Sequence, residues 1–305
     1  HNKSLPHYGA FREKMGQPCQ LASYESQVLP FVTKELAPGQ RPHELLLLQA
    51  LLTKGQISQT DFQALLKNYG AYDSPALEKS LEAILSLDFY DVKSGSTSQK
   101  AKYGGEPVAC LKDGGWSLNP QIVQASPDFL RLFKDAVETG LFLAKEKDPA
   151  QDFTLYAAYD RKEVCRLLNW PLDVSRPMYG YRLSGNVCPV FITYQKTDQE
   201  QRNARYDNQA RGQRLAWYTR TPRHLSSPEV QQLLRGTESG QQVTRIPVFV
   251  KRADAYGPKF YYLGSAKIDP ATVREVNLKG KSAVGLDLVL PDPLPAKIAD
   301  QLFSN

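Results

Sequence analysis

The chain has 305 residues, of which 41% are hydrophobic and 23% are charged, and its formal net charge is +6 with a pI of about 9.0. No apolar run reaches the roughly 20 residues of a membrane-spanning helix and no signal-peptide pattern opens the chain, so we expect a cytoplasmic protein without a membrane partner. The length predicts two domains, and the mild excess of positive charge favours an acidic partner.

The cysteines lie far apart in the sequence, at Cys19, Cys110, Cys165 and Cys188. They form no CxxC pair and no cluster with histidine, so the spacing favours buried thiols over a zinc site or a disulfide framework. We therefore predict no metal and no cofactor.

Residues 1–40 show scattered apolar positions without a clean period, which predicts an irregular arm or connector. Residues 41–87 predict three helices, because leucines recur at helical spacing and Ser58 and Ser74 stand where helix N-caps are expected.

In residues 88–119 the helical pattern gives way to short strands and turns. Short strands are predicted at 89–92, 108–111 and 116–118, with a Ser/Gly/Lys loop at 93–105. Three helices followed by a small hairpin is the order of a winged helix, and the lysines of the loop would make its wing basic. One alternative is that the loop is only a solvated hairpin tip. Another is a protein-docking module, because winged helices bind proteins as well as DNA.

The second half predicts short strands joined by turns. A helix from Ser126 ends near a polar break at residues 145–149, where we expect a domain boundary. Beyond it the patterns predict a capped helix, a short helix and at least five strands. The expected fold class is α+β, a helical domain that could be a winged helix followed by a mostly-β domain with a bent sheet or small barrel. The predicted segments are an arm at 1–40, a helical domain at 41–148, a β-rich domain at 149–290 and a tail at 291–305.

Several stretches together resemble a known family. RKEVCRLLNW (161–170), MYGY (178–181), CPVFITY (188–194) with Lys196, Tyr206-Asp207 and FYYLG (260–264) match, in order, an uncharacterised domain at the carboxyl end of bacterial superfamily-2 DEAD/DEAH-box helicases. The resemblance covers about residues 152–267, and the helices before it resemble the connector of those proteins. It implies an accessory region used in DNA processing or restriction and defence, with a helicase or nuclease partner. The chain holds neither a GxxxxGK[ST] loop nor a DEAD or DEAH box, so the motor is not in these residues.

The aromatic-basic stretch at residues 194–223 is the strongest functional signal, with seven Lys and Arg against three Asp and Glu. Guanidinium groups bind phosphates and flat rings stack on bases, so the stretch predicts DNA binding. The predicted contacts are Tyr194, Lys196, Arg205, Tyr206, Arg214, Trp217, Arg220, Arg223 and His224, and a pocket for one base would involve Tyr179 and Tyr181. The alternative is a solvated loop beside a core Trp217.

Two other functions fit parts of the sequence. Asp152, Asp160 and Lys162 are the residue types of a metal-dependent nuclease, although Asp160 with Glu163 also forms a capping box for the helix that follows. The same arginines could instead face an acidic protein partner or a helicase motor, in a docking or autoinhibitory module. The predicted function is a non-catalytic DNA-binding accessory region.

Overall fold

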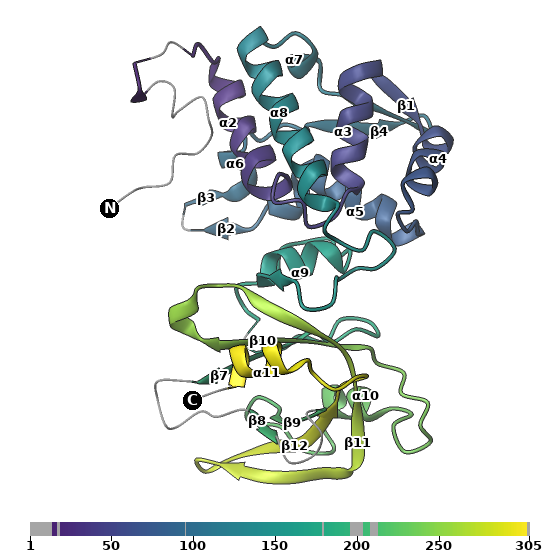
Figure 1. The fold of residues 1–305 in the computed structure, drawn as a ribbon, viewed down its shortest axis with the longest axis vertical. Coiled ribbons are helices and arrows are strands. Elements are labelled where there is room, and N and C mark those ends of the chain that lie inside the picture. The colour runs from purple at the N-terminus through teal and green to yellow at the C-terminus, as the bar shows by residue number, and fades with distance from the viewer. Residues whose placement is uncertain are drawn as a thin grey trace. The chain divides into compact units, whose positions relative to one another are not determined.

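The computed structural model describes residues 14–16, 19–94, 96–178, 180–195, 204–207 and 213–303, with the backbone alone at 94, 195 and 204–207. The chain forms two compact units, shown in Figure 1: unit 1 holds His1–Phe153 and Cys165–Val174, and unit 2 holds Thr154–Val164 and Ser175–Asn305. The division passes through α9 (Arg161–Leu167). None of the described helices has the length and apolarity needed to cross a membrane.

Unit 1 is mainly helical, with short strands between the helices. Its elements in chain order are α2 (Ser23–Phe31), the π-helix η1 (Val32–Leu36), α3 (His43–Lys54), β1 (Gln56–Ser58), α4 (Gln59–Tyr69), α5 (Pro75–Leu85), the 3-10 helix η2 (Asp88–Tyr90), β2 (Lys93–Ser94), β3 (Thr97–Ser98), α6 (Gln99–Lys102), β4 (Ala109–Lys112), β5 (Gly115–Leu118), α7 (Pro120–Val123) and α8 (Pro127–Ala144). Strands β1, β5 and β4 form an antiparallel sheet in that order.

The three helices predicted at residues 41–87 are confirmed as α3, α4 and α5. The hydroxyl of Ser58 accepts a hydrogen bond from the backbone N–H of Asp61 at 3.0 Å, and that of Ser74 accepts one from Leu77 at 3.2 Å. These are the side-chain caps that the sequence pattern indicates. Leucines on the inner faces of all three helices are buried, so the apolar period identifies the core correctly.

Three predictions for unit 1 differ from the structure. Residues 23–36, predicted to be irregular, are helical as α2 and η1, where Val28, Leu29 and Phe31 are fully buried. The assignment of residues 1–40 as an arm or connector stays a prediction. The strand predicted at 89–92 is the turn η2, because the rings of Phe89 and Tyr90 pack inward, with the ring of Tyr90 5.6 Å from that of Phe31. The loop predicted at 93–105, between the strands predicted at 89–92 and 108–111, contains β2, β3 and α6, and because residues 89–92 form no strand it is not the wing of a hairpin between those two segments.

Unit 2 is built around a bent sheet. Its elements in chain order are β6 (Ala158–Tyr159), the start of α9, β7 (Val190–Gln195), β8 (Ala204–Asp207), β9 (Arg214–Tyr218), α10 (Pro228–Leu234), β10 (Ile246–Ala253), the 3-10 helix η3 (Asp254–Tyr256), β11 (Phe260–Leu278), β12 (Lys281–Val289) and α11 (Ala296–Phe303). The strand order is β7-β10-β11-β12-β9-β8, and β6 pairs with β11. Strands β7 and β10 are parallel, and β10, β11, β12, β9 and β8 pair with their neighbours antiparallel.

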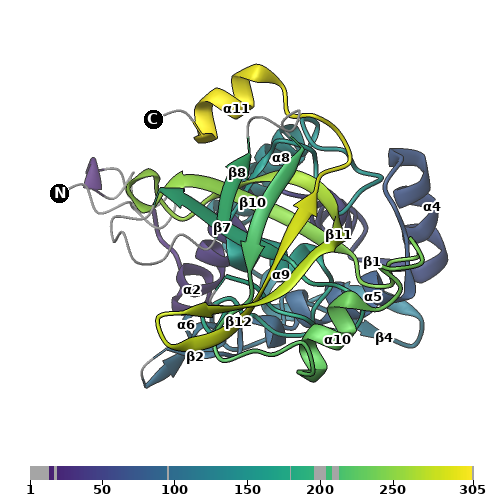
Figure 2. The same cartoon turned by 90° about the horizontal axis from the view of Figure 1, so that it is seen from below.

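The bend comes from β11, which pairs first with β10 and then with β12 (Figures 1 and 2). Its register on β12 shifts between Asp269 and Arg274, the kind of irregularity that lets one strand curve strongly. The hydrogen-bonded path through the described strands does not close into a barrel. The predicted α+β fold, a helical part followed by a sheet-rich part with a bent sheet, is confirmed.

Alternate positions of the strands face two different clusters. Val190, Val248 and Val250 lie in the main core with Trp217. On the other face Phe191 and Phe249 stack with ring centroids 5.0 Å apart, and Phe260 packs on Phe191 at 5.2 Å. This alternation is the period-2 pattern of a sheet covered on both sides.

Candidate nucleic-acid interface

Three of the predicted contact residues gather around one carboxylate, that of Glu229 in the first turn of α10. Arg223 donates from Nε to Oε2 of Glu229 at 2.6 Å, and Arg220 donates to Oε1. The hydroxyl of Tyr181 donates to the same carboxylate at 3.3 Å. Burial alone would raise the pKa of Glu229, but the hydrogen bonds from the two arginines hold it below its usual value, so the carboxylate stays ionised. Glu229 therefore fixes the two guanidinium groups in place.

The rings of Trp217 and Tyr181 lie inside unit 2. Trp217 is 3% exposed and Tyr181 is 2% exposed, and their centroids lie 4.9 Å apart in an edge-to-face contact. The guanidinium carbon of Arg220 lies 4.8 Å from the Tyr181 centroid. Burial, with the charge of Glu229, raises the pKa of Tyr181 to about 12. This placement agrees with the core alternative for Trp217, and base stacking by either ring stays a prediction that requires the ring to become exposed.

The segment that carries Arg220 and Arg223 runs beside β12, because the backbone N–H of Thr219 donates to the carbonyl oxygen of Val284 at 2.9 Å; Figure 1 shows the hairpin of β11 and β12 at the bottom. The hairpin turns at Lys279-Gly280, whose φ angles are +54° and +79°, the combination that a tight type I′ turn requires. The backbone N–H of Arg223 donates to the carbonyl oxygen of Ser282 at 2.9 Å, so the chain after β9 follows β12 toward the hairpin tip.

A second carboxylate, that of Glu275, ties this chain segment to β11. Its Oε1 accepts a hydrogen bond from the backbone N–H of Leu225 at 2.8 Å, and its Oε2 lies 3.5 Å from Nδ1 of His224. Exposed Arg274, Lys279 and Lys281 belong to the same hairpin. We name as the hairpin-tip cluster the residues Arg220, Arg223, His224, Arg274, Lys279 and Lys281.

Of the other predicted contacts, Arg214 pairs with carboxylates of the sheet and Tyr194 packs on the carboxyl-terminal helix. Nη1 of Arg214 lies 2.5 Å from Asp269 and 3.7 Å from Asp287. The ring of Tyr194 lies 4.9 Å from that of Phe303. Two of the predicted contacts, Lys196 and Tyr179, fall outside the described residues, and Arg205 and Tyr206 belong to β8, which is described by its backbone alone.

Arg274, Lys279 and Lys281 were missed as candidate contacts. The available signal was Lys-Gly-Lys at residues 279–281 between two alternating stretches, which predicts a hairpin with a charged tip. The approach of Arg223 to Ser282, next to Lys281, depends on strand order, which the sequence alone does not reveal.

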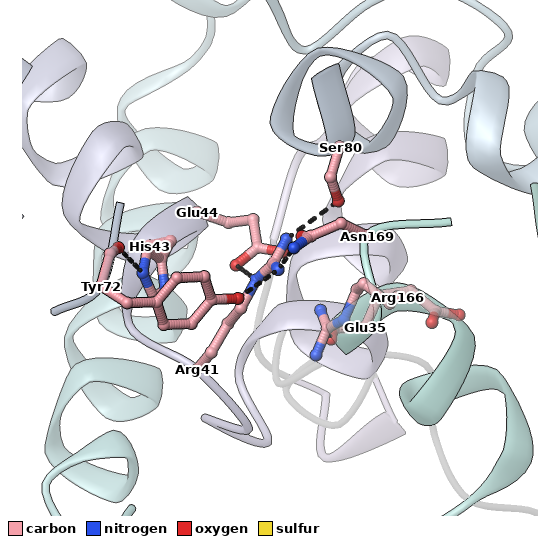
Figure 3. Close-up of polar contacts among 8 residues, drawn as sticks. All are labelled: Glu35, Arg41, His43, Glu44, Tyr72, Ser80, Arg166 and Asn169. Carbon is pink, nitrogen blue, oxygen red and sulfur yellow. Dashed lines mark hydrogen bonds and ion pairs between the residues drawn. The ribbon is translucent and has the colours of Figure 1, made fainter. Parts of the chain in front are cut away.

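A buried polar network in unit 1 has a different character. Nε of Arg41 donates to both carboxylate oxygens of Glu44 at 3.0 Å, and its other nitrogens donate to Tyr72, Asn169 and Ser80 (Figure 3). Burial would raise the pKa of Glu44, yet the charge of Arg41 lowers it to about 2. The two side chains are 2% and 1% exposed, so the pair serves folding and offers no surface to a ligand.

The same network holds two other groups. Burial and the charge of Arg41 lower the pKa of His43 to about 4, and its Nε2 lies 2.8 Å from the carbonyl oxygen of Tyr72. Nη1 of Arg166 donates to the backbone oxygen of Glu35 at 2.6 Å. Since Arg166 and Asn169 belong to Cys165–Val174, these bonds attach that segment to the rest of unit 1.

One of the residues considered for a nuclease, Asp160, has a structural use. The backbone N–H of Glu163 donates to Asp160 at 2.8 Å and that of Asp160 donates to Glu163 at 2.7 Å, so the predicted capping box is confirmed. Within the described parts of the chain, no group of three His, Cys, Asp or Glu side chains is placed to hold a metal ion.

Two family models divide the chain between them. Residues 153–302 match the family described as "Domain of unknown function (DUF3427)", and residues 1–149 match the one described as "Domain of unknown function (DUF8090)". No curated protein matches the chain. Neither family description names a helicase, so the relation to helicases stays a prediction.

Solved structures with partial similarity include three DNA-related proteins. The "DNA modification-dependent restriction endonuclease AspBHI" is 18% identical, with 48% of this chain and 78% of that chain covered and a TM-score of 0.32. The structure of KRYPTONITE in complex with mCHH DNA, a histone H3 peptide and SAH is 11% identical, with 92% of this chain and 45% of that chain covered and a TM-score of 0.33. The structure of the sulfur-binding and SRA domains of ScoMcrA with phosphorothioated DNA is 10% identical, with 86% of this chain and 89% of that chain covered and a TM-score of 0.29. None of these TM-scores reaches the level at which two structures share a fold, so the ligands of those proteins are not transferred to this chain.

Proposed function

We propose that this chain is a non-catalytic DNA-binding accessory region and that unit 2 carries the binding surface. The observation that supports the proposal is the division of charge between the units. Unit 2 holds 21 Lys and Arg against 13 Asp and Glu, a formal charge of +8, whereas unit 1 holds 17 against 19, a formal charge of −2. The basic character of the chain therefore belongs to unit 2 alone, and a polyanion would be drawn to that unit.

Within unit 2 the hairpin-tip cluster is the described surface best suited to a phosphate backbone. It combines lysines on an exposed hairpin with guanidinium groups already oriented by Glu229. An arginine held by a carboxylate keeps its remaining N–H donors for a second anion, and its side chain loses less conformational freedom on binding. The predicted contacts Lys196 and Arg205 stay predictions.

The direct test is a titration of the whole chain with fluorescent single-stranded and double-stranded DNA, unmodified and base-modified, and with poly-glutamate as an acidic polypeptide. We expect at least one DNA to bind more tightly than poly-glutamate of equal charge. The variant Arg274→Gln/Lys279→Gln/Lys281→Gln should bind that DNA at least about tenfold more weakly, because phosphate contacts supply most of such affinity.

The matched control removes the same charge from exposed lysines of unit 1, as Lys54→Gln/Lys67→Gln/Lys79→Gln, and should bind as the parent does. Equal losses in both variants would contradict the assignment to unit 2. Tighter binding of poly-glutamate than of every DNA would favour the alternative of an acidic protein partner.

One observation favours a second function for unit 1. The order α3-β1-α4-α5-β4-β5, with β5 between β1 and β4, supports the proposal that these residues form a winged helix. Its third helix, α5, exposes Glu82 and Lys79 with Glu78 partly exposed, a surface without the positive charge that a DNA-reading helix needs. We therefore assign protein docking to unit 1. Glu78→Gln/Glu82→Gln should leave DNA affinity unchanged, and a clear change would assign α5 to DNA.

A further inference from the structure

Arg161, the first residue of α9, is a cation without a hydrogen bond to the described protein. Its guanidinium carbon lies 5.0 Å from the ring centroid of Phe260 and 5.4 Å from that of Phe191. Its Nε is buried and has no partner. Burial lowers the pKa of Arg161, which shows that the charge is held partly out of water. Buried donors normally have an acceptor, so the Nε of Arg161 lacks one.

A second cation lies over the same aromatic ring. Nζ of Lys251 is 4.6 Å from the Phe260 centroid, and the residue is 7% exposed. It donates to the carbonyl oxygen of Gly257 at 3.1 Å and pairs with Asp254 at 2.7 Å. Asp254 is also the carboxylate whose charge acts on Arg161. The carboxylate of Asp254, whose side chain is 74% exposed, therefore stabilises the positive charges of both Lys251 and Arg161.

Arg252, the next residue of β10, does not belong to this group. Successive residues of a strand face opposite sides of the sheet, so Lys251 lies with Phe260 and Phe249 whereas Arg252 lies on the face of Val250. Its guanidinium carbon lies 5.9 Å from the ring of Tyr256. The cations beside Phe260 are therefore Lys251, near the carboxyl end of β10, and Arg161, at the start of α9.

We propose that Arg161 and Lys251 form a binding site for a phosphate group, and that its occupant is a backbone phosphate of DNA. Arg161 and Lys251 carry two positive charges against the one negative charge of Asp254, and Nε of Arg161 has no acceptor. One tetrahedral oxyanion would balance the charge and accept hydrogen bonds from the guanidinium group. Asp254 can turn into solvent when the anion enters, because most of its side chain is already exposed. The choice of DNA as the source rests on the proposed function, and free inorganic phosphate has the same chemistry.

The test uses the full chain and the variant Arg161→Gln in two measurements. In the first, inorganic phosphate is added at constant ionic strength, with chloride as the reference, and the melting temperature is recorded. The parent should show a saturable rise that the variant lacks. In the second, DNA is titrated at several salt concentrations, and the variant should lose about 0.9 from the slope of log K against log salt, the share of one phosphate.

Lys259→Gln is the matched control, because Lys259 is exposed, lies next to Phe260 in sequence and already has a carboxylate partner in Glu163 at 3.2 Å. It should behave as the parent in the phosphate measurement. If Arg161→Gln does not fold, Lys251→Gln replaces it, with the same expected losses.

The outcomes separate the site from the proposed function. A parent that binds no DNA but responds to phosphate would overturn the proposed function and the DNA occupant. A variant that loses the phosphate response but keeps its DNA salt slope would overturn the DNA occupant alone. If the parent shows no phosphate response and the variant binds DNA as the parent does, the site itself is refuted.

Discussion

Two arginines, one in each unit, show two different uses of a cation that packs against the interior of its unit. Arg41 in unit 1 is 3% exposed and donates to Glu44, Tyr72, Asn169 and Ser80. Arg161 in unit 2 rests on two aromatic rings and has no hydrogen bond to the described protein. A cation whose donors are all used by the fold is part of the core, whereas one with unused donors is prepared for a ligand. The comparison predicts that changes at Arg41 affect stability and that changes at Arg161 affect binding.

The largest effect on stability is expected from removing the negative charge of Glu44, the counter-ion of Arg41. Glu44→Gln would leave a buried guanidinium without its counter-ion, which typically costs about 3–5 kcal/mol. Urea unfolding of the parent and the variant measures this loss. Replacing both partners, as Arg41→Met/Glu44→Leu, should be less harmful than Glu44→Gln alone, because no uncompensated charge remains. A loss below about 1 kcal/mol for Glu44→Gln would refute the structural role of the pair.

The next effect concerns pH. His43 keeps a pKa of about 4 in the folded chain against 6.5 when unfolded, so the unfolded chain binds more protons between these values and stability falls as the pH falls from 6.5 to 4. Glu44, with a pKa of about 2 against 4.5, adds a further loss between 4.5 and 2. At 1.36 kcal/mol per pKa unit the His43 share is roughly 3 kcal/mol.

The variant His43→Gln isolates that share, since its amide can still donate to the carbonyl oxygen of Tyr72. Unfolding free energies measured from pH 7 to pH 4 should change less with pH in the variant than in the parent. Parallel curves would show that His43 does not titrate between the two states.

A smaller effect is expected at the far end of the network. Oδ1 of Asn169 accepts from Arg41 at 2.7 Å, and Asn169 itself has a φ of +57°. Both Asn169→Ala and Asn169→Gly lose the hydrogen bond to Arg41. Alanine is also strained at the left-handed backbone conformation of this position, whereas glycine adopts it freely. Glycine should therefore be the more stable variant by about 1 kcal/mol, measured by urea unfolding. Equal stabilities would show that the backbone conformation contributes nothing.

The smallest stability effect is expected at Arg161. Arg161→Gln gives up two cation–π contacts, worth about 0.5–1 kcal/mol each at partly exposed sites, but also removes a desolvated charge. The change in unfolding free energy should stay within about 1 kcal/mol. A loss as large as that of Glu44→Gln would mean that Arg161 belongs to the core and would end the comparison.

Local signals in the sequence predicted much of the secondary structure. Ser58 and Ser74 mark helix starts, and Asp160 with Glu163 marks the start of α9, because caps involve residues three positions apart. The strand at 89–92 was predicted wrongly, since the packing of Tyr90 against Phe31 overrides the local β-propensity of an aromatic pair.

The contacts that the sequence could not predict, in the core and at the candidate site, join distant parts of the chain. Arg41 and Asn169 are 128 residues apart, and no periodicity connects them. The pairing of Arg223 with Glu229 was within reach of the sequence, at six residues, but the approach of Arg223 to Ser282 follows from strand order. Trp217 was the central residue of the predicted stacking surface, and its burial depends on the helix and strands that cover it.

The central claim is that the positive charge of unit 2 binds DNA, and the salt dependence of DNA affinity tests it most directly. The slope of log K against log salt, measured for the parent, for Arg274→Gln/Lys279→Gln/Lys281→Gln and for Lys54→Gln/Lys67→Gln/Lys79→Gln, counts the phosphates that each variant loses. We predict a slope about 2–3 shallower for the unit 2 variant and an unchanged slope for the unit 1 variant. Three superimposable lines, or a loss confined to the unit 1 variant, would contradict the claim.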